Sequence, residues 1–227
     1  MSAVAQRLTE VLRPVTHVLL DFDGPVCGVF SGLPAPEVAR RLRRVLPDDG
    51  QCQAIGATET DPLSLLRSIA HFWPDLAGDA DAALTALEVE AVQSGRPNPE
   101  GESVLRSCAV TGRRVSIVSN NSGAAIARYL ADHGLSDLVA GVFGRPPGDL
   151  SSMKPSPRLL LGAMEAAGTD PEHCIFVGDA VRDVEAGHSA GVRTIGYANK
   201  PGKDARLAAA GAVVVVDSMA LISDALT

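Results

Sequence analysis

The sequence of 227 residues is poor in aromatic side chains, which make up 4% of it and include a single Trp. Leu, Val, Ile and Ala must therefore supply most of the core. Cysteine is also scarce, with four residues and no C-x-x-C pair or histidine spacing that would complete a zinc site. These cysteines are Cys27, Cys52, Cys108 and Cys174. Their spacing favours free thiols in a reducing compartment over a disulfide framework.

Positive charge is also in short supply, since 20 Lys and Arg face 27 Asp and Glu, giving a net charge of -7 and a pI near 5.2. This balance argues against binding to nucleic acid or to an anionic membrane surface. No apolar run approaches the length of a membrane span, and the first residues, with Arg7 and Glu10, lack the apolar core of a signal peptide. We therefore expect a cytoplasmic protein. The sequence carries no signal for its oligomeric state.

Apolar, β-branched runs alternate with helical segments along most of the chain. Continuous apolar strands separated by helices are typical of a parallel sheet that is buried on both faces. The pattern therefore predicts an α/β fold, a Rossmann-like parallel sheet covered by helices on both faces. The expected strands are residues 15–20, 115–118, 139–143, 174–177, 192–196 and 213–216.

The helical part between the first two strands has a different pattern. Three helical segments follow one another without a convincing strand, beginning near Pro36, Asp61 and Asp79. Asp61 is the expected N-cap of the second, with Pro62 in its first turn. Residues 94–99 have the composition of a linker. We predict an inserted α-helical cap domain at 34–94, and a catalytic core made of 1–33 and 95–227.

Polar and charged residues follow the ends of the expected strands. In open α/β sheets, ligands bind beyond the carboxyl ends of the strands, so these side chains should meet at one edge. They are Asp21 and Asp23 after the first strand, Ser119 and Asn120 after the second, Lys154 in the loop after the third, and Asp179 and Asp183 after the fourth.

This collection has a chemical logic. Carboxylates that lie close together repel one another unless a cation joins them, and hard oxygen ligands at this charge suit Mg²⁺. A lysine, a hydroxyl and main-chain N–H groups suit the remaining oxygens of a phosphate. One carboxylate can then attack phosphorus while another moves protons. The sequence therefore predicts a magnesium site and a small phosphorylated substrate.

In sequence, the chain resembles the haloacid dehalogenase superfamily of phosphohydrolases. Four motifs occur in the family's order: LLDFDG, VSIVSN, MKPSP and VGDAVRDVEAG. A bare D-x-D is common by chance, but the four together are specific and span nearly all of the chain outside the helical insert. The insert resembles the small α-helical cap of phosphoglycolate-phosphatase-like members. One position departs from the family, because Pro25 stands where Thr or Val is usual.

The resemblance implies a role for each residue of the motifs. Asp21 would be the nucleophile that forms an aspartyl-phosphate and would bind Mg²⁺ through a side-chain oxygen. Asp23 would be the general acid and base and would bind Mg²⁺ through its main-chain carbonyl. Ser119 and Asn120 would hold phosphate oxygens, and Lys154 would neutralise the charge of the phosphate and of Asp21. Asp179 would bind the metal directly, and Asp183 would support the metal site from the shell of residues behind the direct ligands.

Simpler structural interpretations exist for several of these residues. Asp21 and Asp23 could form a turn or cap at a strand end. Ser119 could be a helix N-cap, a role that Ser122 could fill instead. Asp183 could be an acid favoured by the first turn of a helix.

Three alternatives to a phosphatase follow from the same residues. A phosphomutase of the same superfamily would return the phosphoryl group to a sugar, and a binding module could keep the fold without catalysis. The complete set of acids together with Lys154 argues against the binding module. A dehalogenase has no need of an acid for an alcohol leaving group, so Asp23 argues against it.

Overall fold

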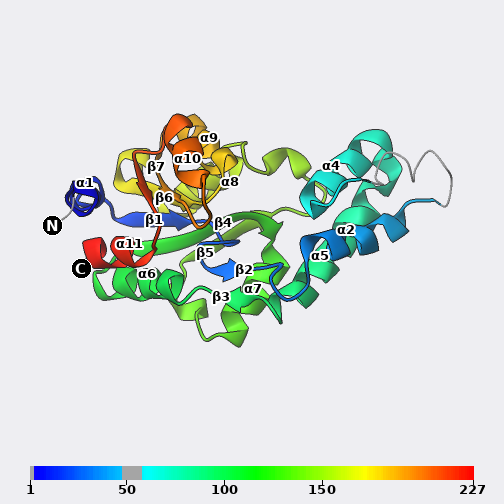
Figure 1. Ribbon diagram of the computed structural model, residues 1–227, viewed down its shortest axis with the longest axis horizontal. Helices are drawn as coiled ribbons and strands as arrows, with labels where there is room; N and C mark the ends of the chain where they lie inside the picture. Colours follow the sequence, from blue (N-terminus) through cyan, green and yellow to red (C-terminus); the bar gives the residue numbers. More distant parts are fainter. Residues whose placement is uncertain (1–2, 48–57) are drawn as a thin grey trace.

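The computed structural model describes residues 3–47 and 58–227, so Cys52 lies outside the described residues. Its main feature is a six-stranded sheet in which every pair of neighbouring strands is parallel, in the order β5-β4-β1-β6-β7-β8 (Figure 1). The strands are β1 (His17–Leu20), β4 (Arg114–Ser122), β5 (Gly141–Arg145), β6 (Cys174–Gly178), β7 (Arg193–Tyr197) and β8 (Val214–Val216).

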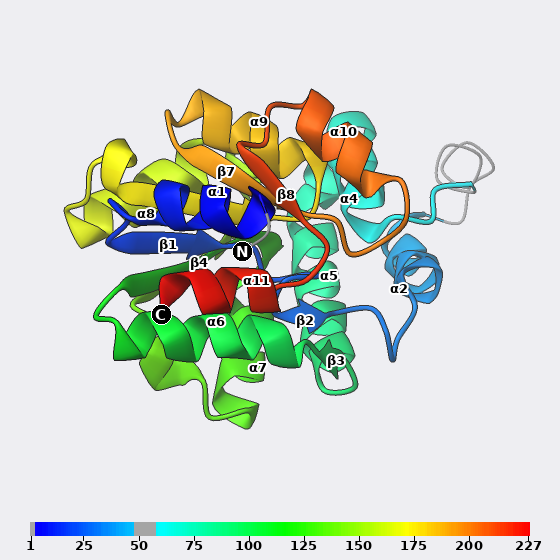
Figure 2. The same cartoon turned by 60° about the vertical axis from the view of Figure 1, so that its left-hand side comes forward.

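Helices cover both faces of the sheet, as the alternation of side chains along β1 requires. Val18 and Leu20 pack in one hydrophobic cluster, whereas Leu19 packs in another on the opposite face. The first cluster is completed by α1 (Ala3–Leu12), α6 (Pro99–Val110), α7 (Gly123–Asp132) and α11 (Ala220–Leu226). The second is completed by α8 (Arg158–Ala167) and α9 (Val181–Ser189). Figure 2 shows α6 and α11 below the sheet and α9 above it, which confirms the predicted fold class.

A helical segment extends from one end of the sheet (Figure 1). Asp61 is the N-cap of α4 (Pro62–Phe72), as predicted, because its carboxylate accepts a hydrogen bond from the Ser64 N–H at 3.0 Å. The segment has a hydrophobic cluster of its own, which Met153 joins from the loop after β5. Its elements are α2 (Ala35–Leu42), η1 (Arg43–Val45), α4 (Pro62–Phe72), η2 (Pro74–Leu76) and α5 (Ala77–Val92). The domain bounds at residues 34 and 94 stay a prediction.

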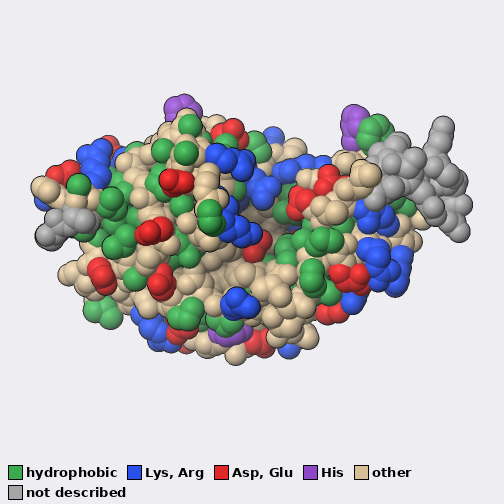
Figure 3. Space-filling view, viewed as in Figure 1, with side chains coloured by type: hydrophobic (Ala, Val, Ile, Leu, Met, Phe, Trp, Pro, Cys, Tyr) green, Lys and Arg blue, Asp and Glu red, His purple; other side chains and the backbone are tan. Residues whose placement is uncertain are grey.

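A cleft of about 750 Å³ lies between the helical segment and the sheet, lined by Pro34, Asp61 and Leu63 on one side and by Asp23 and Asp179 on the other. Lys and Arg side chains gather around this recess (Figure 3). The cleft lining carries both signs of charge, with Arg96, Arg182 and Lys200 beside the three aspartates Asp23, Asp61 and Asp179.

Several strands differ from the sequence-based expectation. Strand β1 begins at His17 and not at residue 15, and β5 spans Gly141–Arg145 and not 139–143. The expected linker contributes β3 (Arg96–Pro97), which pairs antiparallel with β2 (Cys27–Gly28), and two-residue strands are too short to show periodicity. Strand β4 continues to Ser122. The sequence-based prediction ended it at Val118, because its last four residues are polar and lack the apolar signal of a buried strand. None of the helices in the described ranges is both long and apolar enough to cross a membrane.

Candidate active site

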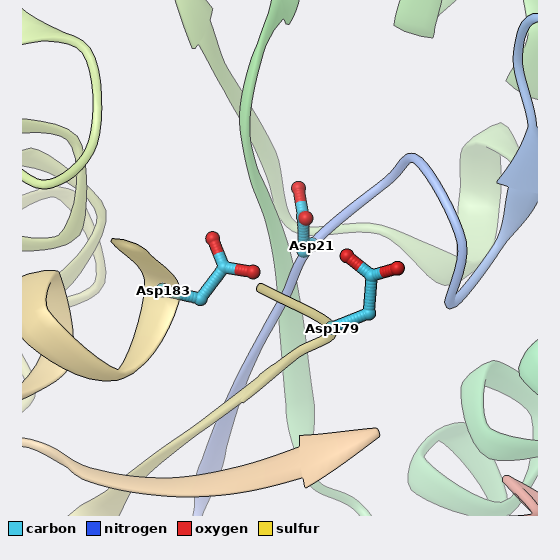
Figure 4. A group of neighbouring side chains, drawn as sticks. All are labelled: Asp21, Asp179 and Asp183. Atoms are coloured by element: carbon cyan, nitrogen blue, oxygen red, sulfur yellow. The ribbon is translucent and has the colours of Figure 1, made fainter. Parts of the chain in front are cut away.

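Strand register brings the predicted residues to one edge of the sheet. Leu20 lies beside Ile117 and Val177 in the two neighbouring strands, so the residues after all three strands meet. Figure 4 shows the carboxylates of Asp21, Asp179 and Asp183 around a common space. Each contributes an oxygen, and these oxygens all lie within 4.8 Å of one another.

Lys154 is the buried cation of the site, with 1% of its surface exposed. Its Nζ lies 2.8 Å from Asp21 Oδ1, 2.8 Å from Asp183 Oδ1, and 3.1 Å from the Val118 carbonyl oxygen. The ammonium group thus donates a hydrogen bond to the Val118 carbonyl and forms ion pairs with both carboxylates. Burial alone would lower the pKa of Lys154, but the two carboxylates outweigh it and hold that pKa above its usual value. Lys154 therefore stays charged.

Asp21 and Asp23 both have raised pKa values. Burial raises the pKa of Asp21 to about 7, although Lys154 opposes the shift. Burial also raises the pKa of Asp23 to about 6, against a hydrogen bond that its Oδ1 accepts from the Val29 N–H at 3.0 Å. A carboxyl group with a pKa near 6 can exchange a proton near neutral pH, which is the requirement for a general acid and base.

The turn after Asp23 depends on glycine. Gly24 has φ of +106°, a conformation that residues with a Cβ rarely adopt. A Cβ at this position would also lie 2.8 Å from Asp179 Oδ2. Gly24 thus lets the chain pass close to Asp179.

Asp179 has two partners that sequence reasoning missed. Its Oδ2 accepts hydrogen bonds from Asn199 Nδ2 at 2.8 Å and from Lys203 Nζ at 2.5 Å. Lys203 begins α10 (Lys203–Ala209), and Asn199 lies just after β7. Their position in the sequence could have identified them, because both residues follow the carboxyl end of a strand of the sheet, as Asp21 and Asp179 do.

Asn120 and Ser119 lie near the end of β4, and both residues are buried. Asn120 binds the main chain of Lys154 twice: its Oδ1 accepts from the Lys154 N–H at 2.7 Å, and its Nδ2 donates to the Lys154 carbonyl at 3.1 Å. It therefore positions Lys154. Ser119 Oγ donates to Asn121 Oδ1 at 3.2 Å, and it is Ser122 that caps α7.

Both interpretations of Asp183 describe its contacts. Its Oδ2 accepts a hydrogen bond from the Ala180 N–H at 2.9 Å, at the start of α9, while its other oxygen pairs with Lys154. The side chain is fully buried. One carboxylate thus joins the start of α9 to Lys154.

The chain is similar in sequence to known hydrolases. Residues 74–197 match the family model described as haloacid dehalogenase-like hydrolase. The chain is 28% identical to a plasmid-encoded phosphoglycolate phosphatase of Cupriavidus necator, over 97% of this chain and 96% of that protein. It is 30% identical to a phosphoglycolate phosphatase of Xylella fastidiosa, over 77% of this chain and 76% of that one. Against several other phosphoglycolate phosphatases the match spans only 42–47% of their length.

Solved structures share the fold at low sequence identity. A predicted phosphoglycolate phosphatase from Haemophilus somnus superposes with a TM-score of 0.69 at 18% identity, covering 94% of this chain and 99% of that one. CbbY from Rhodobacter sphaeroides, solved with xylulose-(1,5)-bisphosphate, gives a TM-score of 0.66 at 16% identity, covering 91% and 95%. With the match to the family model, these findings lead to one conclusion: the chain belongs to the haloacid dehalogenase-like hydrolase family and is an enzyme of its phosphatase type.

Proposed function

We propose that this protein is a magnesium-dependent phosphomonoesterase that works through an aspartyl-phosphate on Asp21. The observation that carries the proposal is the buried Lys154, whose ammonium lies 2.8 Å from both Asp21 and Asp183. It leaves one oxygen of Asp21 outside the ion pair. Asp179 and Asp23 lie beside the same space, on the wall of the cleft.

Mg²⁺ fits the residues present. Asp21, Asp179 and Asp183 place carboxylate oxygens within 4.8 Å of one another, and carboxylates are the hard ligands that Mg²⁺ takes. Without a cation, burial raises the pKa of Asp21 to about 7, and a bound cation favours its ionised form. Asp21 and Asp179 would hold the ion through side-chain oxygens and Asp23 through its carbonyl, with Asp183 behind them. When bound, the ion would neutralise phosphate charge and orient the phosphoryl group.

The chain's own residues supply the covalent chemistry. An oxygen of Asp21 attacks phosphorus, and the bond to the leaving oxygen breaks while Asp23 protonates that oxygen. Asp23 then takes a proton from water, which attacks phosphorus, releases inorganic phosphate and restores Asp21. Lys154 holds positive charge beside Asp21 throughout, and Ser119 would donate to a phosphate oxygen.

The substrate proposed is a small phosphorylated metabolite that fits the cleft of about 750 Å³. Relatives named phosphoglycolate phosphatase make phosphoglycolate the first compound to assay, and the ligand of CbbY makes a pentulose bisphosphate the second. The helical segment at 34–94, proposed as the cap, contributes one wall of the cleft and would select among substrates.

Release of inorganic phosphate from a panel of phosphomonoesters tests the function. We expect release that depends on Mg²⁺ and stops in excess chelator. Asp21→Asn should abolish turnover while keeping the folded far-UV spectrum. Release that persists in chelator would overturn the metal requirement, and wild-type turnover by Asp21→Asn would overturn the nucleophile. Transfer of phosphate to a sugar, with none released, would instead identify a phosphomutase.

A further inference from the structure

A buried ionic cluster lies next to the catalytic residues but outside the predicted set. It consists of Arg145, at the end of β5, with Asp81 and Glu88 of α5, and is called the Arg145 cluster here. Arg145 Nε lies 2.7 Å from Asp81 Oδ1, and its Nη1 and Nη2 lie 3.0 and 3.1 Å from the two oxygens of Glu88. The side chains of Arg145 and Glu88 are completely buried and that of Asp81 is 7% exposed.

The Arg145 cluster forms hydrogen bonds with three successive residues at the end of β4. Arg145 Nη1 donates to the Asn120 carbonyl at 2.9 Å. Glu88 accepts from Asn121 Nδ2 at 3.2 Å through one oxygen and from the Ser122 N–H at 2.9 Å through the other. These three residues directly follow Ser119, so the cluster determines where this strand end lies.

The same cluster reaches the lysine loop by two routes. Asp81 Oδ2 accepts a hydrogen bond from the Gly148 N–H at 3.0 Å, within the loop that leads to Lys154. Asn120, whose carbonyl Arg145 binds, holds the Lys154 main chain through its side-chain amide. A continuous set of hydrogen bonds therefore runs from α5 to the lysine beside Asp21.

Stability alone does not explain such a cluster. Burying three charges has a large desolvation cost, and apolar residues of similar volume often stabilise a core as well or better. What an ionic cluster adds is geometry, because its hydrogen bonds permit few arrangements of the groups that they join.

We propose that Glu88 and Arg145 are positioning residues that hold the end of β4 and, through Asn120, Lys154 in the arrangement that phosphate transfer needs; this inference rests on the proposed function. Helix α5 belongs to the segment proposed as the cap. The cluster thus couples the cap to the catalytic centre through buried ion pairs, as well as through the substrate.

Glu88→Gln tests the proposal, because it keeps the size of the side chain and removes its charge. Glu90→Gln is the matched control, on the same helix, with a side chain that is 52% exposed and paired with Arg41. We expect Glu88→Gln to lower kcat about 10- to 100-fold, as small misplacements at a catalytic centre do, with Mg²⁺ affinity within twofold of wild type. Glu90→Gln should match wild type in both.

Amide hydrogen exchange supplies a readout that needs no activity. In Glu88→Gln, exchange should rise at least about tenfold in residues 119–122 and 148–156, with little change in β1 and β6. Unchanged exchange there, or a fall in global stability with wild-type kcat, would overturn the proposal. If Glu88→Gln does not fold, Asp81→Asn should show the same rise in amide exchange at residues 148–156. An Asp81→Asn variant with unchanged exchange there would count against the proposal. A wild-type protein without phosphatase activity would refute the proposed function, while the exchange data would still decide the positioning.

Discussion

At the scale of single residues, two lysines on different sides of the site compensate the negative charge of its aspartates. Lys154 contacts Asp21 and Asp183, whereas Lys203 contacts Asp179 from α10. They differ in exposure, since the side chain of Lys154 is 2% exposed and that of Lys203 is 24% exposed. A partly exposed lysine can turn into solvent at little cost, so we expect Lys203 to leave Asp179 when a metal binds there.

Lys203→Met should therefore tighten Mg²⁺ binding, about two- to tenfold, because it removes a positive charge in contact with a proposed ligand. Calorimetric titration of Mg²⁺ into the free protein measures this directly. Lys203→Arg keeps the charge and serves as the control, with affinity close to wild type. Weaker binding by Lys203→Met would show that Lys203 orients Asp179 more than it competes with the ion.

Asp23 and Asp179 should separate proton transfer from metal binding. Asp23→Asn should reduce kcat roughly 100- to 10,000-fold, the range for loss of a general acid, and leave Mg²⁺ affinity nearly intact. Asp179→Asn should weaken Mg²⁺ binding, because it removes a charged ligand. Parallel kinetics and calorimetry on both variants decide the matter; an equal loss of affinity in the two would refute this division.

At the scale of elements, the two ends of β1 have different tasks. The carboxyl end carries Asp21, while the amino end carries His17, which is completely buried. His17 Nε2 lies 2.9 Å from Ser116 Oγ of β4. Burial, and next the charge of Arg114, lower the pKa of His17 to about 4. This end of the strand therefore holds a neutral histidine in the core, far from the chemistry.

The lowered pKa predicts how stability changes with acid. His17 of the unfolded chain binds a proton below about pH 6.5, whereas His17 of the folded protein binds one only near pH 4, because its pKa is lowered. The contribution of neutral His17 to the free energy of unfolding is thus complete above pH 6.5 and is lost as the pH falls toward 4. Urea unfolding of wild type and His17→Asn at several pH values isolates it, because other groups cancel in the difference. A difference in unfolding free energy that stays constant from pH 7 to 4 would contradict the prediction.

At the scale of the whole molecule, the cleft lies between parts that are joined in several places. One wall of the cleft is the helical segment. Its hydrophobic cluster includes Met153, from the loop that carries Lys154. Helix α5 reaches further, because Ala91 and Val92 pack in the main core. The proposed active site is thus assembled from segments spread over most of the chain, and a ligand that bridges them should stabilise the whole fold.

Mg²⁺ should therefore raise the melting temperature. A ligand at about 100 times its Kd adds roughly 2.7 kcal/mol, which corresponds to a rise of about 5–10 °C for a chain of this size. Asp179→Asn should lose most of this shift. Asp137→Asn, an exposed acid in η3 (Ser136–Leu138), is the control and should keep it. An equal shift in both variants would place the ion away from Asp179.

Local patterns in the sequence determined much of this molecule. Apolar runs predicted the strands of the parallel sheet, and Asp61 and Ser122 are the helix caps that their residue types suggested. The rule that polar residues after parallel strands meet at one edge selected the residues that the structure brings around Lys154. Such inferences succeed because strand periodicity, capping and parallel topology are properties of short segments or of their order.

Only the tertiary structure decided which distant groups pair. Arg145 meets Glu88 across 57 positions of the chain, and Lys203 meets Asp179 across 24. Glu88 and the exposed Glu90 lie two positions apart on α5, and the packing of this helix against the core buries one and leaves the other in solvent. A charge becomes a structural or catalytic element through its desolvation and its partners, and both are set by how the elements pack.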